Sequence, residues 1–195
     1  MAWSIAALDE RLAALASAPV GAGRVTSVCV RPGPDGREHP EVLQLSPERG
    51  ALGDRWERRA WVRLSDGRSD PRVQVAVAPA RVIAMIQELS GCDRHPGDTL
   101  LVDMDLEARH LPVGSRIRVG TAVVEVSDVE NDACAKFAAR HGDDVLAWIR
   151  APQNRERRLR GLYARVVQAG EVRAGDLAQV LGPGEGDAGG RQPGA

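Results

Sequence analysis

The sequence predicts a mainly β protein, either a β-barrel or a rolled sheet, with a few helices added to it. Short apolar stretches with strand-like alternation recur along the chain and are separated by glycine-containing turns, a pattern typical of barrels built from short strands. Helical periodicity is confined to a few short segments. Aromatic residues make up only 3% of the 195 residues, so aliphatic side chains must fill the core.

Eight stretches have the composition and spacing of strands. They are residues 24–31, 42–45, 72–78, 99–102, 116–119, 122–129, 161–168 and 177–181. The fifth and sixth flank the dipeptide Gly120-Thr121 and predict a hairpin. Many short strands linked by glycine turns, with a few helices, indicate a β-barrel or a rolled sheet.

Three segments predict helices. Residues 4–16 carry apolar side chains at helical spacing behind Ser4, a good N-cap. Residues 80–89 form a second helix that ends at Gly91, and residues 135–150 form a third. The predicted organisation is therefore an N-terminal helix in residues 1–20, a barrel domain in residues 24–181 and a disordered glycine-rich tail in residues 182–195.

Composition excludes several classes of protein. The formal net charge of −1 argues against a chain-wide nucleic-acid or membrane-surface binder. The three cysteines form no disulfide framework, and the N-terminus lacks the pattern of a signal peptide. We therefore expect a cytoplasmic protein with no nucleic acid and no membrane among its partners.

The most informative residue is Cys134, which stands where a β-rich run gives way to a helical one. A thiol at that junction, beside the ammonium group of Lys136, is in surroundings that favour the thiolate. Such a thiolate serves as a nucleophile, a sulfur carrier or a ligand for a soft metal. The alternative is that Cys134 is a small buried apolar residue, as many free cysteines are.

The remaining cysteines and histidines give weaker signals. Cys29 lies within a predicted strand and is expected to be core. Cys92, Asp93 and His95 share a polar loop and form an incomplete zinc pattern. His141 follows Cys134 by two helical turns, where capping or a surface position is expected in preference to general-base catalysis.

Two groups of arginines could bind an anion. One follows the glycine-bracketed loop 50–56, whose tip holds Asp54 and Arg55, and the other includes Arg160. A run of charge is usually only a solvated face. If either group lies near Cys134, guanidinium groups could bind phosphate or pyrophosphate there.

The order of these motifs resembles the MOSC domain, named for the C-terminal part of eukaryotic molybdenum-cofactor sulfurase, and the small standalone bacterial members most of all. The resemblance spans residues 24–181. It rests on the loop 50–56, the strand and helix of 73–86, the segment 111–114, the hairpin 119–126, the tetrapeptide 134–137 and the strand 160–166 with the glycines after it.

The resemblance implies a MOSC-type β-barrel of the pyruvate-kinase-like kind, with peripheral helices. It implies that Cys134 is the family cysteine, which ligates molybdenum in a pterin cofactor or carries persulfide sulfur. By position Asp54, Arg55 and Arg160 match family residues, and with Lys136 they are our candidates for cofactor binding. A pyridoxal phosphate role for Lys136 is set aside, because the chain is too short to contain that domain of the larger relatives.

Three functions remain open. The first is a molybdenum-dependent oxidoreductase that reduces N-oxygenated small molecules, with electrons from a partner protein. The second is a sulfur carrier or sulfurtransferase, loaded on Cys134 by a cysteine desulfurase. The third is a binding module without catalysis. The sequence also departs from the family pattern, with Asp98 in a segment where many members have Asn, and Ala133 where many have Gly or Pro.

Overall fold

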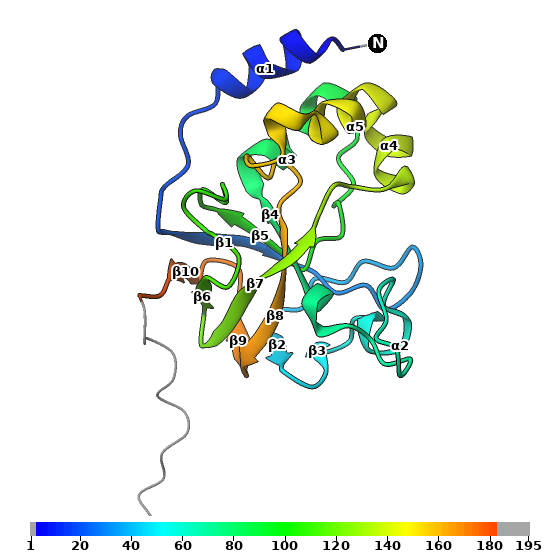
Figure 1. Ribbon diagram of the computed structural model, residues 1–195, viewed down its shortest axis with the longest axis vertical. Coiled ribbons are helices and arrows are strands. Elements are labelled where there is room, and N and C mark those ends of the chain that lie inside the picture. Colours follow the sequence, from blue (N-terminus) through cyan, green and yellow to red (C-terminus); the bar gives the residue numbers. More distant parts are fainter. Residues whose placement is uncertain (1–2, 183–195) are drawn as a thin grey trace, which may run out of the picture.

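The computed structural model of the chain describes residues 3–182 and confirms a mainly β architecture with a closed barrel. Each barrel strand pairs with the next and the last closes on the first (Figure 1). The strands, in order around the barrel, are β1 (Ala22–Val28), β10 (Leu177–Val180), β6 (Arg116–Val119), β7 (Ala122–Glu130), β8 (Leu162–Gln168), β4 (Val75–Pro79) and β5 (Leu100–Asp103).

Strand direction follows from the connections. The hairpin predicted across residues 120 and 121 is present as β6 and β7. The pair β4 and β5 is parallel and is joined through helix α3 (Ala80–Ser90), since a parallel pair needs a crossover. A small sheet of β3 (Gly50–Ala51), β2 (Leu43–Ser46) and β9 (Gly170–Val172) lies beside the barrel.

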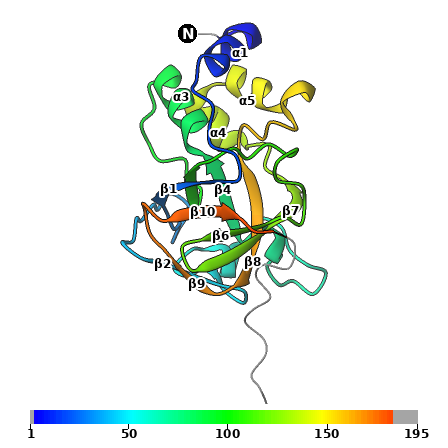
Figure 2. The ribbon, with the colours of Figure 1, turned by 90° about the vertical axis from the view of Figure 1, so that its left-hand side faces the viewer.

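Four helices gather at one end of the barrel (Figures 1 and 2). They are α1 (Ile5–Ala13), α3, α4 (Ala135–His141) and α5 (Asp143–Arg150). Helix α2 (Trp56–Arg59) lies toward the opposite end, and 3-10 turns occur at Pro71–Val73 and Pro152–Asn154. The predicted caps are present, with Ser4 accepting the backbone N–H of Ala7 and Gly91 in the left-handed conformation after α3.

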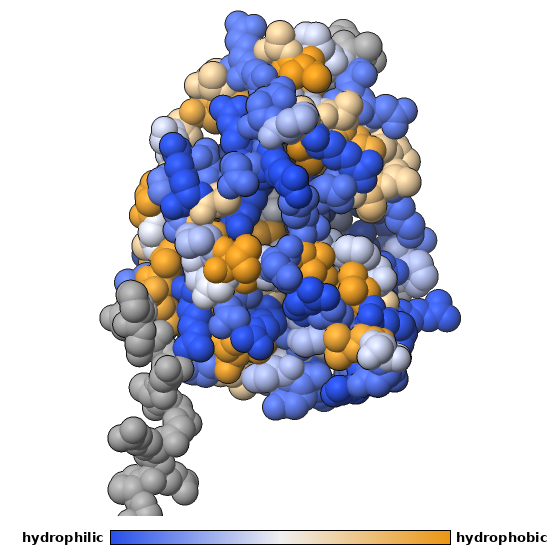
Figure 3. All heavy atoms as spheres, in the orientation of Figure 1, coloured by the Kyte–Doolittle hydropathy of each residue, from blue (hydrophilic) through white to orange (hydrophobic). Residues whose placement is uncertain are grey.

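Two apolar cores hold these layers together. Valine and leucine side chains from the strands fill the barrel. The second core lies under the helices and joins Leu8 of α1, Ile86 of α3, Phe137 of α4 and Trp148 of α5. On the face in Figure 3 the apolar residues form small separate groups within a mostly hydrophilic surface. Because α4 packs into the second core through Phe137, the segment around Cys134 is anchored.

Three local predictions need correction. The helix expected over 135–150 is two helices, because Gly142 adopts φ 97° and ψ 153°, which breaks the helical hydrogen bonding. The strand expected over 24–31 ends at Val28, so Cys29 lies just beyond it. The strand expected from residue 72 begins at Val75, after a 3-10 turn.

The predicted division at residues 20, 24 and 181 stays a prediction, and its disordered tail lies outside the described residues except for Gly182. Between residues 3 and 182, no helix is both long and apolar enough to span a bilayer.

Candidate functional site

Cys134 is exposed at the junction between the barrel and the helical end. It follows β7 and occupies the N-cap position of α4, where its carbonyl oxygen accepts the N–H groups of Phe137 (2.8 Å) and Ala138 (3.1 Å). The side chain makes no capping hydrogen bond, so the thiol is available to a ligand. The preceding Ala133 has φ 66°, a left-handed conformation that turns the chain from the strand into the helix.

A buried ion pair lies close to this cysteine. Nη1 of Arg160 donates to Oδ1 of Asp98 at 2.7 Å, and only 11% and 2% of the two side chains are exposed. The guanidinium also lies over the Phe137 ring, 5.2 Å from its centroid, so α4 and the segment before β8 are joined through it. The predicted residues Cys134 and Arg160 are therefore neighbours.

The charges of Arg160 and its neighbours affect one another's pKa values. Burial lowers the pKa of the Arg160 guanidinium. The neighbouring Asp98 raises it most, and Tyr163 and the Cys134 sulfur raise it further, so the net shift of this pKa is upward. The guanidinium therefore stays charged beside the thiol. Burial likewise raises the pKa of the Tyr163 phenol, so this group is neutral at pH 7.

The buried pair is not fully satisfied. Nε of Arg160 and Oδ2 of Asp98 are buried and, within residues 3–182, have no hydrogen-bond partner. Buried polar atoms almost always find one. This corner therefore has one donor and one acceptor that remain for a bound group or water.

Aromatic side chains flank the same corner. The ring of Trp61, 66% exposed, lies 5.8 Å from the ring of Tyr163 in a tilted arrangement. Tyr163 in turn lies within the fields of Arg160, Asp98 and Cys134. An exposed indole beside the site offers a face on which a planar group could stack.

Asp54, the next predicted residue, holds the chain itself. Its carboxylate accepts the backbone N–H (2.8 Å) and Nε (2.9 Å) of Arg31 and the backbone N–H of Trp56 (2.8 Å), and it is almost fully buried. Arg55 donates its backbone N–H to the carbonyl of Arg31 at 2.8 Å. These bonds fasten the glycine loop to the end of β1, and cofactor binding by either residue stays a prediction.

Lys136 points toward a different partner. Its Nζ lies 4.0 Å from a carboxylate oxygen of Asp35, and both side chains are exposed. The contact ties α4 loosely to the loop after β1. The structure therefore brings Cys134 and Arg160 together and leaves Lys136 at the rim. Asp54 is linked to the same region through Arg31, whose pKa burial lowers but Asp54, Asp98 and Tyr163 raise, with a net upward shift.

A cluster that the sequence did not indicate joins Cys29, His39 and His95. Potential ligand atoms of these three residues lie within 4.8 Å of one another. They come from the end of β1, the loop after it and the loop before β5. Because these segments are far apart in the sequence, no local motif indicates the cluster. The predicted grouping of Cys92, Asp93 and His95 is wrong, because within the described residues His95 comes together with Cys29 and His39 instead.

The hydrogen bonds of this cluster do not suit a metal. His39 donates Nδ1–H to the carbonyl of Val28 at 2.8 Å, which leaves its Nε2 lone pair free. Nδ1 of His95, however, accepts the N–H of Gly97 at 3.1 Å, so its proton stays on Nε2. Burial also lowers the pKa of His95 to about 4 and raises that of Cys29. The set offers one free imidazole lone pair rather than two.

His141 is buried, contrary to the expected surface or capping role. Its Nδ1 lies 2.9 Å from Oγ of Ser90, and its ring packs against Phe137 at 4.5 Å between centroids. Burial lowers its pKa to about 4, so it is neutral at pH 7. It therefore helps to fasten α4 to α3.

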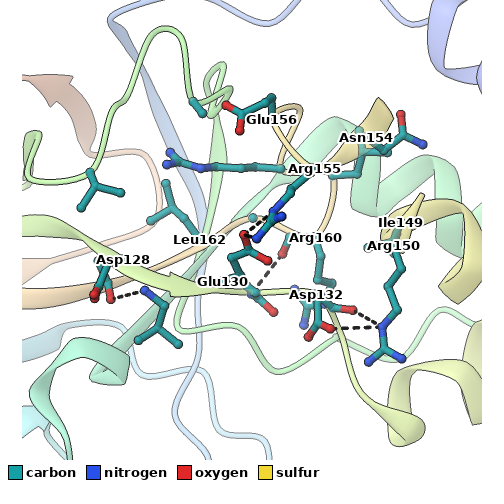
Figure 4. Close-up of a pocket in the computed structure, with 18 of the residues that line it drawn as sticks. Asp128, Glu130, Asp132, Ile149, Arg150, Asn154, Arg155, Glu156, Arg160 and Leu162 are labelled. Atoms are coloured by element: carbon teal, nitrogen blue, oxygen red, sulfur yellow. Dashed lines mark hydrogen bonds and ion pairs between the residues drawn. The ribbon is translucent and has the colours of Figure 1, made fainter. Parts of the chain in front are cut away.

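A hollow of about 810 Å³ lies on the other side of Arg160 (Figure 4). It runs along the end of β7 and the turns before β8, and Cys134 is not part of its wall. Two ion pairs line it, Arg155 with Glu130 and Arg150 with Asp132. Arg158, another lining residue, donates to the backbone carbonyls of Leu106 and Leu111, so much of the charge in this hollow is engaged by the protein's own groups.

Comparison with known proteins finds a family match over part of the chain. The sequence model of the MOSC domain matches residues 92–179. The fold is similar to the YuaD protein from Bacillus subtilis, with 20% identity, a TM-score of 0.55, and coverage of 82% of this chain and 95% of that one.

Two further solved structures share the fold. YiiM from Geobacillus stearothermophilus has 17% identity and a TM-score of 0.57, with 84% of this chain and 77% of that chain covered. YiiM from Escherichia coli has 17% identity and a TM-score of 0.53, with 84% and 70% covered. No curated protein sequence matches this chain.

Proposed function

Because residues 92–179 match the MOSC domain model, we propose that the chain binds a molybdenum-pterin cofactor with the Cys134 thiolate as a ligand to the metal, and that it reduces N-oxygenated small molecules. The family is associated with molybdenum-cofactor binding. The observation that carries the proposal is an exposed thiol beside a buried, incompletely hydrogen-bonded arginine–aspartate pair. The exposure also removes the reading in which Cys134 is only a core residue.

The residues around Cys134 fit such a group. A thiolate suits a soft metal, and the unpartnered Nε–H of Arg160 and Oδ2 of Asp98 supply a buried donor and acceptor. The exposed face of Trp61 suits a planar ring system. When bound, the cofactor supplies the two-electron chemistry that the side chains of this protein lack.

The protein's own residues would position and tune the site. The guanidinium of Arg160 keeps positive charge behind the thiolate, and Asp98 holds that guanidinium in place at 2.7 Å. Phe137 anchors the helix on which Cys134 stands. Electrons would come from a reducing partner protein, in a cytoplasmic setting that also keeps the three thiols reduced.

Metal and pterin analysis tests the proposal. Wild-type protein purified from a host that makes the cofactor should hold molybdenum and pterin in near-equimolar amounts. Cys134→Ser should lose most of the metal, whereas the matched control Cys92→Ser should keep it. Wild-type protein that holds neither molybdenum nor pterin contradicts the proposal.

A second function is favoured by the same exposure of the thiol. The Cys134 thiolate could attack the terminal sulfur of a cysteine desulfurase persulfide, so that the S–S bond breaks, the desulfurase thiolate leaves and Cys134 gains the sulfur. Intact mass measured before and after incubation with a desulfurase and cysteine should then rise by one sulfur atom and fall again with a reductant. No gain in mass on wild-type protein would exclude this function.

A further inference from the structure

Three arginines near α4 have no carboxylate partner. Arg37, Arg94 and Arg140 each donate to a backbone carbonyl, and within the described residues no Asp or Glu forms an ion pair with them. The acceptors are the carbonyls of Gly36 (2.6 Å), Asp35 (2.9 Å) and Pro96 (3.5 Å) respectively. Most of the other arginines in the described chain, such as Arg31, Arg72 and Arg81, do pair with a carboxylate. These three therefore concentrate unneutralised positive charge.

The three guanidinium groups lie close enough to repel one another. Burial is the main cause that lowers the pKa of Arg37, and the positive charges of Arg140, Arg31 and Arg94 lower it further. They come from the loop after β1, the loop before β5 and helix α4. These segments contact one another, because Arg94 reaches the carbonyl of Asp35 and Arg140 that of Pro96. An anion bound among them would remove this repulsion.

Arg37 also has an unused donor. Its Nε is buried and, among the described residues, has no hydrogen-bond partner. The side chain lies against Gly97, where a Cβ would come within 2.5 Å of this nitrogen, and Gly97 has φ +93°. The glycine therefore lets the guanidinium lie flat on the loop with one N–H group unengaged.

The cluster is within reach of a ligand at Cys134. Arg140 follows Cys134 by six residues on α4, which corresponds to about 9 Å along a helix axis. Lys136 lies one turn before Arg140 at the rim, where its ammonium group is paired with Asp35. A ligand whose anionic end is bound by the arginines could therefore present its other end to the thiol.

We propose that Arg37, Arg94 and Arg140 form a binding site for a phosphoryl group. Guanidinium groups bind phosphate oxygens in pairs, and a dianion matches a site with several positive charges better than a carboxylate does. The phosphoryl group belongs either to the pterin cofactor or to a phosphorylated substrate. Only that choice rests on the proposed function, since anion binding itself needs no metal.

Calorimetric titration with inorganic pyrophosphate tests the site. Wild-type protein should bind it saturably, and Arg37→Gln and Arg140→Gln should each weaken binding about 10-fold or more, because each removes a charge-assisted contact. Arg173→Gln is the matched control, since this exposed arginine pairs with Glu171 in the small sheet, and it should bind as wild type does. Melting curves establish that each variant folds.

Two results would overturn the site. One is wild-type protein that binds neither phosphate nor pyrophosphate. The other is a double variant, Arg37→Gln with Arg140→Gln, that binds pyrophosphate as tightly as wild type. Both are independent of molybdenum, so failure of the proposed function and failure of this site remain distinguishable.

The source of the phosphoryl group follows from pterin analysis of the same variants. If the cofactor supplies it, the double variant should lose pterin together with pyrophosphate binding. If a substrate supplies it, the double variant should keep pterin while it loses pyrophosphate binding. Both results support the site, and they separate the two ligands.

Discussion

Replacing Asp98 by Asn should destabilise the fold by about 3–5 kcal/mol, as expected when one partner of a buried ion pair is removed. Asp98 is 2% exposed and Arg160 11%, so water cannot replace the lost charge. With a nitrogen–oxygen distance of 2.7 Å the charge centres lie roughly 4 Å apart, where the attraction is about 4 kcal/mol at an effective dielectric constant near 20. Both routes give the same size of effect.

Urea unfolding at pH 7 measures this loss directly. In a thermal scan the same change should lower Tm by about 6–20 °C, at roughly 2–4 °C per kcal/mol for a chain of this length. Asp66→Asn is the matched control, because Asp66 and Arg68 form an exposed pair whose loss should leave the stability close to that of wild type.

The double variant Asp98→Asn with Arg160→Met separates the charge effect from simple loss of packing. It should recover part of the lost stability, since no unpaired guanidinium remains. An Asp98→Asn protein within about 1 kcal/mol of wild type would refute the reasoning, because Arg160 would then not depend on its partner.

Three further predictions follow from the neighbouring structure. Burial holds the pKa of His141 at about 4 against 6.5 in an unfolded chain, so the unfolded state binds the proton first and stability falls as the pH drops through that window. His141→Asn should reduce this slope by up to about 1.4 kcal/mol per pH unit in urea titrations between those values, and an unchanged slope would contradict it. Ala133→Gly should stabilise the protein by about 0.5–1 kcal/mol in urea unfolding, since φ at this position is 66°, and a loss of stability would count against the strain. Gly161→Ala should lower the free energy of unfolding by at least about 3 kcal/mol in the same measurement, because the added Cβ would lie 2.0 Å from the Val77 carbonyl oxygen. Gly114→Ala, whose Cβ would have no atom within 4 Å, should lower it much less, and equal losses would contradict the prediction.

The parts of the barrel that depend on local sequence patterns could be predicted from the sequence. The hairpin of β6 and β7 needs only a glycine turn between alternating valines, and the caps at Ser4 and Gly91 are single-residue rules. The break between α4 and α5 had an equally local sign in Gly142. It was missed because the apolar periodicity continues on both sides of that glycine.

The candidate site was accessible only in part. Cys134 could be identified from its position between a predicted strand and a predicted helix, and Arg160 from its position before a predicted strand. The arginine cluster could not be predicted, because Arg37, Arg94 and Arg140 lie more than 40 residues apart and meet only through the barrel topology. The cluster of Cys29, His39 and His95 could not be predicted either, because its members also meet only in the fold. Of the three, only His95 belongs to a loop whose sequence resembles a partial zinc site.

X-ray absorption at the molybdenum edge tests most directly whether Cys134 is a metal ligand. The spectrum of cofactor-loaded wild-type protein should require one more sulfur neighbour than the pterin provides, and Cys134→Ser, reconstituted with the same cofactor, should lose that neighbour. Cys92→Ser should give the wild-type spectrum. A wild-type spectrum without the additional sulfur, or one that Cys134→Ser leaves unchanged, would contradict the account.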